Sequence, residues 1–163
     1  MTTAEGVRDE QDQRYAHPGT IRRRLYSHSY ESGKAISAVD VAKALGREPG
    51  RIFKTLVTIG RSGQYYVFII PGPKELDLRK AAAAVHEKSV EMIPSKTLLP
   101  LTGYIHGGCS PLGMKKTFPT TIDMSASEWD TIIISAGKIG LQTELSLDEL
   151  QKALKFSLGD LTT

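Results

Sequence analysis

The sequence predicts a mixed α+β fold in which a curved, mixed β-sheet or barrel carries flanking helices. Short segments rich in β-branched and aromatic residues outnumber the helical segments, and the two kinds do not alternate regularly along the chain. A doubly wound parallel sheet would need that alternation. The length of 163 residues suits one domain. We expect that domain over residues 20–163, after a polar, flexible leader over residues 1–19.

In the first half of the chain, turn and capping residues separate the predicted elements. Ser37 and Asp40 give the first helix an S-x-x-D start, and Asp77 lies near the start of an alanine-rich helix. Gly60 and Gly63 separate two runs that read as a hairpin. The expected elements are strands at 25–31, 51–59 and 64–70 and helices at 37–45 and 76–85.

The second half contains more predicted strands than helices. Ser146 and Glu149 form a capping box at the start of the last helix. The glycine-rich segment 103–113 is expected to lie beside a site. The expected elements are strands at 89–93, 120–124, 131–135 and 141–144, a short helix or turn at 94–101, and a final helix from 146 to about 156.

Composition sets broad limits on function. The formal net charge of +3 and the pI of about 9.0 allow a polyanionic partner but do not require one. Cys109 is the single cysteine, so an intrachain disulfide is impossible and a reducing compartment is favoured. The sequence has no apolar run long enough for a membrane helix and no signal-peptide pattern. The expected location is the cytoplasm.

Lys54 is the most unusual polar residue, because its strand is apolar on both faces. Alternation places Lys54 on one face with Ile52 and Leu56, and Phe53 and Val57 on the other. The lysine either lines a pocket, where its ammonium would hold a phosphate, carboxylate or ester carbonyl, or points to water at the start of the strand. The strand pattern leaves both interpretations open.

The segment 103–113 gives the second indication of a site. Gly107 and Gly108 allow main-chain N–H groups to approach a ligand closely, as in an oxyanion hole. Ser110–Gly113, with proline second, predicts a β-turn. Lys115 and Lys116 follow and are well placed to meet an anion. The alternative is an ordinary surface turn.

Nucleophilic and metal-dependent chemistry find little support in the sequence. Cys109 would need a base, and His106 lies three residues away in a segment where neighbours often point to opposite sides. We therefore expect Cys109 to be a small, semi-buried residue. The four histidines show no metal-ligand spacing, so no metal site is expected.

Several motifs together resemble the YbaK/EbsC family, which is similar to the editing domain inserted in bacterial prolyl-tRNA synthetases. They are FKTL at Phe53–Leu56, GGCSPLGMKK at Gly107–Lys116, and Gly137-Lys138 with Gly140-Leu141. The resemblance covers about residues 25–156. It implies a mixed α/β barrel-like domain without a cofactor. It also implies a trans-editing deacylase, a hydrolase that removes cysteine from mischarged Cys-tRNA(Pro).

The same resemblance assigns roles to residues of this chain. It makes Lys54 and Gly108 catalytic: Lys54 would orient the terminal adenosine and the ester, and the N–H of Gly108 would face the ester carbonyl. In the family the substrate's own thiol is thought to attack its ester, so the protein needs no strong nucleophile. The other substrate-binding positions are Tyr30, Gly107, Cys109, Ser110, Lys138 and Gln142, and the tRNA-contact candidates are Arg51, Lys115 and Lys116.

Departures from the family pattern keep other functions open. Ala136, Ile139 and Gln142 stand where many members have glycine, arginine and aspartate. A changed pocket rim would shift the amino acid removed, for example to alanine on tRNA(Pro). The remaining alternative is a non-catalytic module that binds tRNA or prolyl-tRNA synthetase. The expected partners are therefore the 3′ acceptor end of tRNA and, by resemblance, prolyl-tRNA synthetase.

Overall fold

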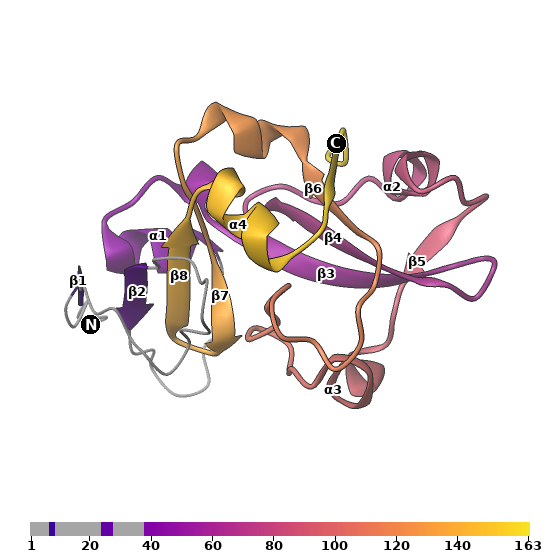
Figure 1. Cartoon of the computed structure of the whole chain (residues 1–163), viewed down its shortest axis with the longest axis horizontal. Coiled ribbons are helices and arrows are strands. Elements are labelled where there is room, and N and C mark those ends of the chain that lie inside the picture. Colours follow the sequence, from indigo (N-terminus) through magenta and orange to yellow (C-terminus); the bar gives the residue numbers. More distant parts are fainter. Residues whose placement is uncertain (1–6, 9–23, 28–37) are drawn as a thin grey trace.

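The computed structural model describes residues 7–8, 24–27 and 38–163 (Figure 1). Of the predicted leader, only Val7–Arg8 falls within this part of the chain, where it forms strand β1. Strand β2 (Arg24–Ser27) gives the start of the strand expected at 25–31. Tyr30 lies outside the described residues, so its predicted role stays a prediction.

The strands form two sheets, which Figure 1 shows running across one another. The four-stranded sheet has the order β1-β2-β8-β7 and is antiparallel throughout. The five-stranded sheet has the order β5-β3-β4-β6-β9, in which β6 pairs in parallel with β4 and β9. The remaining strands are β3 (Phe53–Gly60), β4 (Tyr65–Pro71), β5 (Val90–Met92), β6 (Thr120–Asp123), β7 (Ile132–Lys138), β8 (Leu141–Leu145) and β9 (Ser157–Gly159).

A bridge between Ile52 and Ile133 joins the two sheets. The mixed α+β fold predicted from the sequence is confirmed. Of its two forms, the open sheet is the one observed, because the described strands do not close into a barrel. The predicted hairpin is β3–β4, paired from Phe53 opposite Pro71 to Ile59 opposite Tyr65.

Helices occur where the capping residues predicted them. Asp77 accepts hydrogen bonds from the N–H groups of Arg79 and Lys80, and Ser146 and Glu149 form the predicted capping box. None of the described helices is both long and apolar enough to cross a membrane. The helices are α1 (Ala38–Leu45), α2 (Leu78–Ala84), α3 (Ser95–Thr102) and α4 (Leu147–Ala153), with 3₁₀ turns η2 (Pro49–Arg51) and η3 (Met124–Glu128).

The C-terminal segment differs from the prediction. Helix α4 ends at Ala153 and does not reach 156, because Leu154 adopts an extended backbone with φ −147° and ψ 127°. The chain then forms β9, which the sequence analysis missed, beside β6. Asp123 secures this end of the chain, since its carboxylate accepts a hydrogen bond from the N–H of Leu161 at 3.0 Å.

Hydrophobic packing covers both faces of the β3–β4 hairpin. Phe53 and Val57 belong to one buried cluster, which also contains Ile134 of β7. Leu56 packs against a second cluster that contains Phe68. Because β3 is covered on both faces, a polar side chain on it must lie near an edge of the sheet or in a pocket.

A network around Glu144 of β8 holds the end of α1 to the first sheet. Arg47 donates from both terminal nitrogens to the two carboxylate oxygens of Glu144, each at 2.7 Å. The hydroxyl of Thr131 also donates to Glu144. The Glu144 side chain is 5% exposed, so water screens this charge pair little. At the exposed end of the network, Arg51 donates to Asp130 at 2.7 Å.

We predict that Glu144→Ala lowers the free energy of unfolding by about 3 kcal/mol, because it removes the buried carboxylate on which the arginines converge. The matched control is Asp130→Ala, whose side chain is 84% exposed. It should cost less than about 1 kcal/mol. Urea denaturation followed by circular dichroism measures both changes, and equal losses would contradict the assignment.

Candidate functional site

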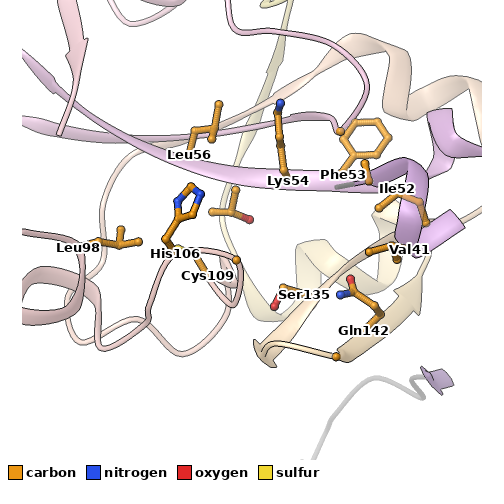
Figure 2. Close-up of a pocket in the computed structure, with 15 residues that line it drawn as sticks. Val41, Ile52, Phe53, Lys54, Leu56, Leu98, His106, Cys109, Ser135 and Gln142 are labelled. Carbon is orange, nitrogen blue, oxygen red and sulfur yellow. The ribbon is translucent and has the colours of Figure 1, made fainter. Parts of the chain in front are cut away.

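A pocket of about 360 Å³ lies beside the junction of the two sheets (Figure 2). Its walls come from α1, β3, the loop after α3, and the facing strands β7 and β8. Among the predicted site residues, Lys54, Gly107, Cys109 and Gln142 line this pocket. The structure therefore brings together residues from three separate sequence motifs.

The pocket lies along the part of strand β3 whose second edge has no partner strand among the described residues. β3 pairs with β4 along nearly its whole length, but with β5 only at Thr58–Gly60. The N–H of Ile93 donates to the carbonyl of Val57 on this second edge, at 3.3 Å. Because edge-facing backbone groups alternate along a strand, the N–H and C=O of Thr55 face the same edge, where the described part of the chain supplies no strand.

Lys54 is partly buried and lines the pocket. Within the described residues it takes part in no ion pair. In Figure 2 Lys54 and Leu56 rise from one side of β3, and His106 and Cys109 lie on the other. A ligand that contacts both Lys54 and the 103–113 loop must therefore bind around the open edge of β3.

A tight turn shapes the loop that faces β3. The N–H of Gly108 donates to the carbonyl of Ile105 at 3.0 Å, and Gly107 has a φ of 88° that favours glycine. This hydrogen bond uses the N–H that the family resemblance assigns to the ester carbonyl. Gly107, and not Gly108, lines the pocket.

Gly108 instead serves close packing in this conformation. A Cβ at this position would lie 3.3 Å from the backbone nitrogen of Ile139, in the turn between β7 and β8. Among the pocket-lining residues of this loop, the backbone N–H groups of His106, Gly107 and Cys109 make no hydrogen bond within the described structure. They are the candidates for an oxyanion site.

The far half of the loop is held by internal hydrogen bonds. The Tyr104 hydroxyl donates to the carbonyl of Leu112. A Cβ on Gly137 would lie 3.0 Å from the Tyr104 ring, so this ring packs against the end of β7. Ser110 is 2% exposed and its hydroxyl accepts from the N–H of Leu112. Ser110 therefore supports the loop and is not among the pocket-lining residues, and its predicted contact with substrate stays a prediction.

Cys109 is buried in the pocket wall, and burial raises the pKa of its thiol to about 11. A hydrogen bond with Thr102 opposes this shift but does not cancel it. The thiol is therefore neutral near pH 7 and unsuited to nucleophilic attack. The structure agrees with the interpretation of Cys109 as a small, semi-buried residue.

The predicted phosphate contacts fall into two groups. Arg51 is engaged inside the fold: it contacts Asp130 and Thr131 and stacks over the Trp129 ring at 4.7 Å. Its side chain is only 12% exposed, which argues against the predicted contact with tRNA. Lys115, Lys116 and Lys138 are exposed at the surface, outside the pocket lining.

Three polar residues of the pocket had no site role assigned from the sequence, namely Thr55, His106 and Ser135. The hydroxyl oxygen of Thr55 is buried and has no hydrogen-bond partner in the described structure. Ser135 lies directly opposite Gln142 in the β7–β8 pair, so both side chains face the same side. Cross-strand pairing of this kind has no local signal in the sequence. In the described part of the chain, no group of three His, Cys, Asp or Glu side chains could hold a metal ion.

Known proteins resemble this chain in sequence and in fold. The family model for the aminoacyl-tRNA editing domain matches residues 33–153. The chain belongs to this family. Over 128 residues it is 49% identical to EbsC of Enterococcus faecalis, covering 78% of each chain, and that protein's name assigns it to Cys-tRNA(Pro) and Cys-tRNA(Cys) deacylation.

Two further similar proteins have names that refer to prolyl-tRNA synthetase. A proline–tRNA ligase of Thermosipho melanesiensis is 35% identical over 75 residues, which is 46% of this chain and 13% of the ligase. A solved structure described as a trans-editing enzyme for prolyl-tRNA synthetase superposes with a TM-score of 0.76 at 26% identity. That match covers 86% of this chain and 87% of the other.

We predict that Cys109 reacts slowly with iodoacetamide in the folded protein. Its pKa of about 11, against the ordinary value of 9.0, leaves about a hundredfold less thiolate at pH 8. Mass spectrometry would follow the alkylation, with the urea-unfolded chain as the reference. Cys109→Ser should also retain most of the activity proposed below, and a rate like that of the unfolded chain would contradict the burial.

Proposed function

We propose that this chain is a free-standing trans-editing deacylase that removes cysteine from mischarged Cys-tRNA(Pro). The observation that carries the proposal is Lys54, a partly buried cation without a described ion-pair partner in the wall of a pocket. A lysine in that position is suited to an anionic or developing negative charge on a ligand. The 49% identity to EbsC supports cysteine as the amino acid removed.

The proposed chemistry relies on positioning and not on a protein nucleophile. The substrate thiol attacks its own ester carbonyl, a C–S bond forms, and the C–O bond to the tRNA ribose breaks. The thiol proton passes to the departing 3′ oxygen, so the products are a cyclic thiolactone and tRNA with a free 3′ hydroxyl. Lys54 and the free N–H groups of the loop would stabilise the charge that develops on the ester oxygen.

The neutral thiol of Cys109 fits this scheme. Its raised pKa keeps it from competing with the substrate thiol for the ester. With a side chain that is uncharged at neutral pH, Cys109 also leaves Lys54 without a nearby protein anion among the described lining residues. The lysine charge is therefore available to the substrate.

We propose that the acceptor end of tRNA approaches along the exposed lysines of the 103–116 segment and the β7–β8 turn. Lys115, Lys116 and Lys138 supply the positive charge at this surface. The relation to proline–tRNA ligases favours prolyl-tRNA synthetase as the partner that selects tRNA(Pro). Because both proposed partners act in translation, we propose that the activity is cytoplasmic.

Substitution of Lys54 tests its role in the proposed reaction. Lys54→Ala and Lys54→Met should lower kcat/KM for Cys-tRNA(Pro) by about a hundredfold. They remove the cation that stabilises the negative charge developing on the ester oxygen in the reacting state. Hydrolysis of Cys-tRNA(Pro), Ala-tRNA(Pro) and Pro-tRNA(Pro) labelled in the amino acid measures the effect. The exposed Lys88, near β5, gives the matched control Lys88→Ala, which should behave as wild type.

Each outcome of this assay bears on a named alternative. Selective loss of alanine by the wild type would keep the site and replace cysteine as the substrate. Failure to cleave any of the three esters, even with prolyl-tRNA synthetase present, would replace the enzyme with a binding module. Full activity of both Lys54 variants would remove the lysine from the mechanism.

Substitution of the surface lysines tests the proposed contact with tRNA. The double variant Lys115→Ala/Lys116→Ala should weaken tRNA binding at low salt and reduce the slope of log K against log salt by about two, because two phosphate contacts are lost. Filter binding from 50 to 200 mM salt would measure the slope. Arg51→Ala should leave the slope unchanged, since that guanidinium is held by Asp130 and Thr131.

A further inference from the structure

Gln142 is a buried polar side chain whose partner in the substrate the family resemblance leaves unspecified. It lies on β8 with 6% of its surface exposed and lines the pocket. Figure 2 shows its amide directed from the strand into the pocket, beside Ser135. No hydrogen bond within the described structure involves this amide. The amide faces the pocket and keeps some contact with solvent there, so a ligand that displaces this water must supply hydrogen bonds to both amide atoms.

The amide defines the chemistry of that ligand. It presents one acceptor oxygen beside one donor nitrogen in a plane, whichever way the group is turned. The complementary ligand edge has a donor next to an acceptor. The Ser135 hydroxyl accepts a hydrogen bond from the N–H of Gly137 at 3.2 Å and keeps its O–H as a donor, so it can add a hydrogen bond beside the Gln142 amide.

The walls around Gln142 favour a flat, uncharged ligand group. Val41 of α1 and Ile52 line the same pocket and are 5% and 4% exposed, within one buried apolar cluster. None of the described lining residues is an aspartate or glutamate, and one of them is the cation Lys54. A buried ammonium group would find no counter-charge among these described lining residues, so the α-amino group of an aminoacyl ester is a poorer match to them than an uncharged group.

Among the groups of an aminoacyl-tRNA end, the adenine base fits these conditions. Its N6 amino group donates next to a ring nitrogen that accepts, and a glutamine amide pairs with this edge through two hydrogen bonds. Its faces are apolar and pack against aliphatic side chains. The pocket volume of about 360 Å³ lies within the range of pockets that hold small ligands.

We propose that Gln142 recognises the adenine of the 3′-terminal nucleotide, with Val41 and Ile52 against the base. This inference rests on the proposed function, because it takes a tRNA end as the ligand. It assigns a use to a departure from the family pattern: a carboxylate at this position could accept from the N6 amino group but could not donate to the ring nitrogen. Gln142 is thus a substrate-positioning residue of this chain.

The test deletes each partner of the proposed contact separately. Cys-tRNA(Pro) that ends in adenosine is compared with the same tRNA ending in purine riboside, which lacks the N6 amino group. For wild type we expect kcat/KM to fall about tenfold to a hundredfold with purine riboside. For Gln142→Leu the two substrates should differ by less than about threefold. Gln142→Glu keeps an acceptor for the N6 amino group and should retain part of the discrimination.

Gln151, exposed on α4, supplies the matched control variant. Gln151→Leu should discriminate between the two tRNA ends as wild type does. Two variants at position 142 guard against a folding defect, which thermal unfolding would detect. Equal hydrolysis of both ends by wild type would overturn the inference, as would full discrimination by Gln142→Leu.

A binding measurement separates this inference from the deacylase proposal. Adenosine 5′-monophosphate and purine riboside 5′-monophosphate, which lacks the N6 amino group, are titrated into the full chain and followed by NMR. Preference for the adenine nucleotide that disappears in Gln142→Leu supports base recognition even if no ester is cleaved. Absence of any preference in a wild-type protein that does hydrolyse Cys-tRNA(Pro) would overturn base recognition and leave the deacylase proposal intact.

Discussion

The open edge of β3 is the constraint on which the rest of the structure depends. β3 is buried on both faces and paired with β4, so its second edge is where polar backbone groups meet a cavity. Its ends are held there, by β5 at Thr58–Gly60 and by the bridge from Ile52 to Ile133. These two attachments keep the strand in place while a gap remains between them, and the pocket occupies that gap.

Around this edge the described side chains combine one lysine cation with a neutral thiol. Lys54 brings one cation to the pocket, and burial keeps the nearby thiol of Cys109 uncharged. The acidic groups close to the junction are occupied elsewhere, as with Glu144, which is held by Arg47 and Thr131. A single positive charge with apolar walls interacts more strongly with a ligand anion than the same charge would in water.

Local patterns predicted the elements of the fold well because their causes are local. The hairpin followed from alternation and the Gly60–Gly63 turn, and α4 began at its capping box. The sequence predicted that α4 runs to about residue 156, but the helix ends at Ala153. The chain beyond it pairs as β9 with the distant strand β6, which local patterns do not reveal. A three-residue strand stabilised by a distant neighbour leaves no periodic signal.

By itself, the sequence determined the fold class, the family resemblance and the identity of Lys54 as the central polar residue of its strand. These follow from residue type and spacing, which the chain carries locally. Only the tertiary structure decided which residues share the pocket. In the folded chain Arg51 donates to Asp130, and the N–H of Gly108 donates to the carbonyl of Ile105. Gln142 and Ser135 lie opposite each other in the pocket wall. Hydrogen bonds between segments far apart in the chain compete for each side chain, and that competition is settled only when the chain is folded.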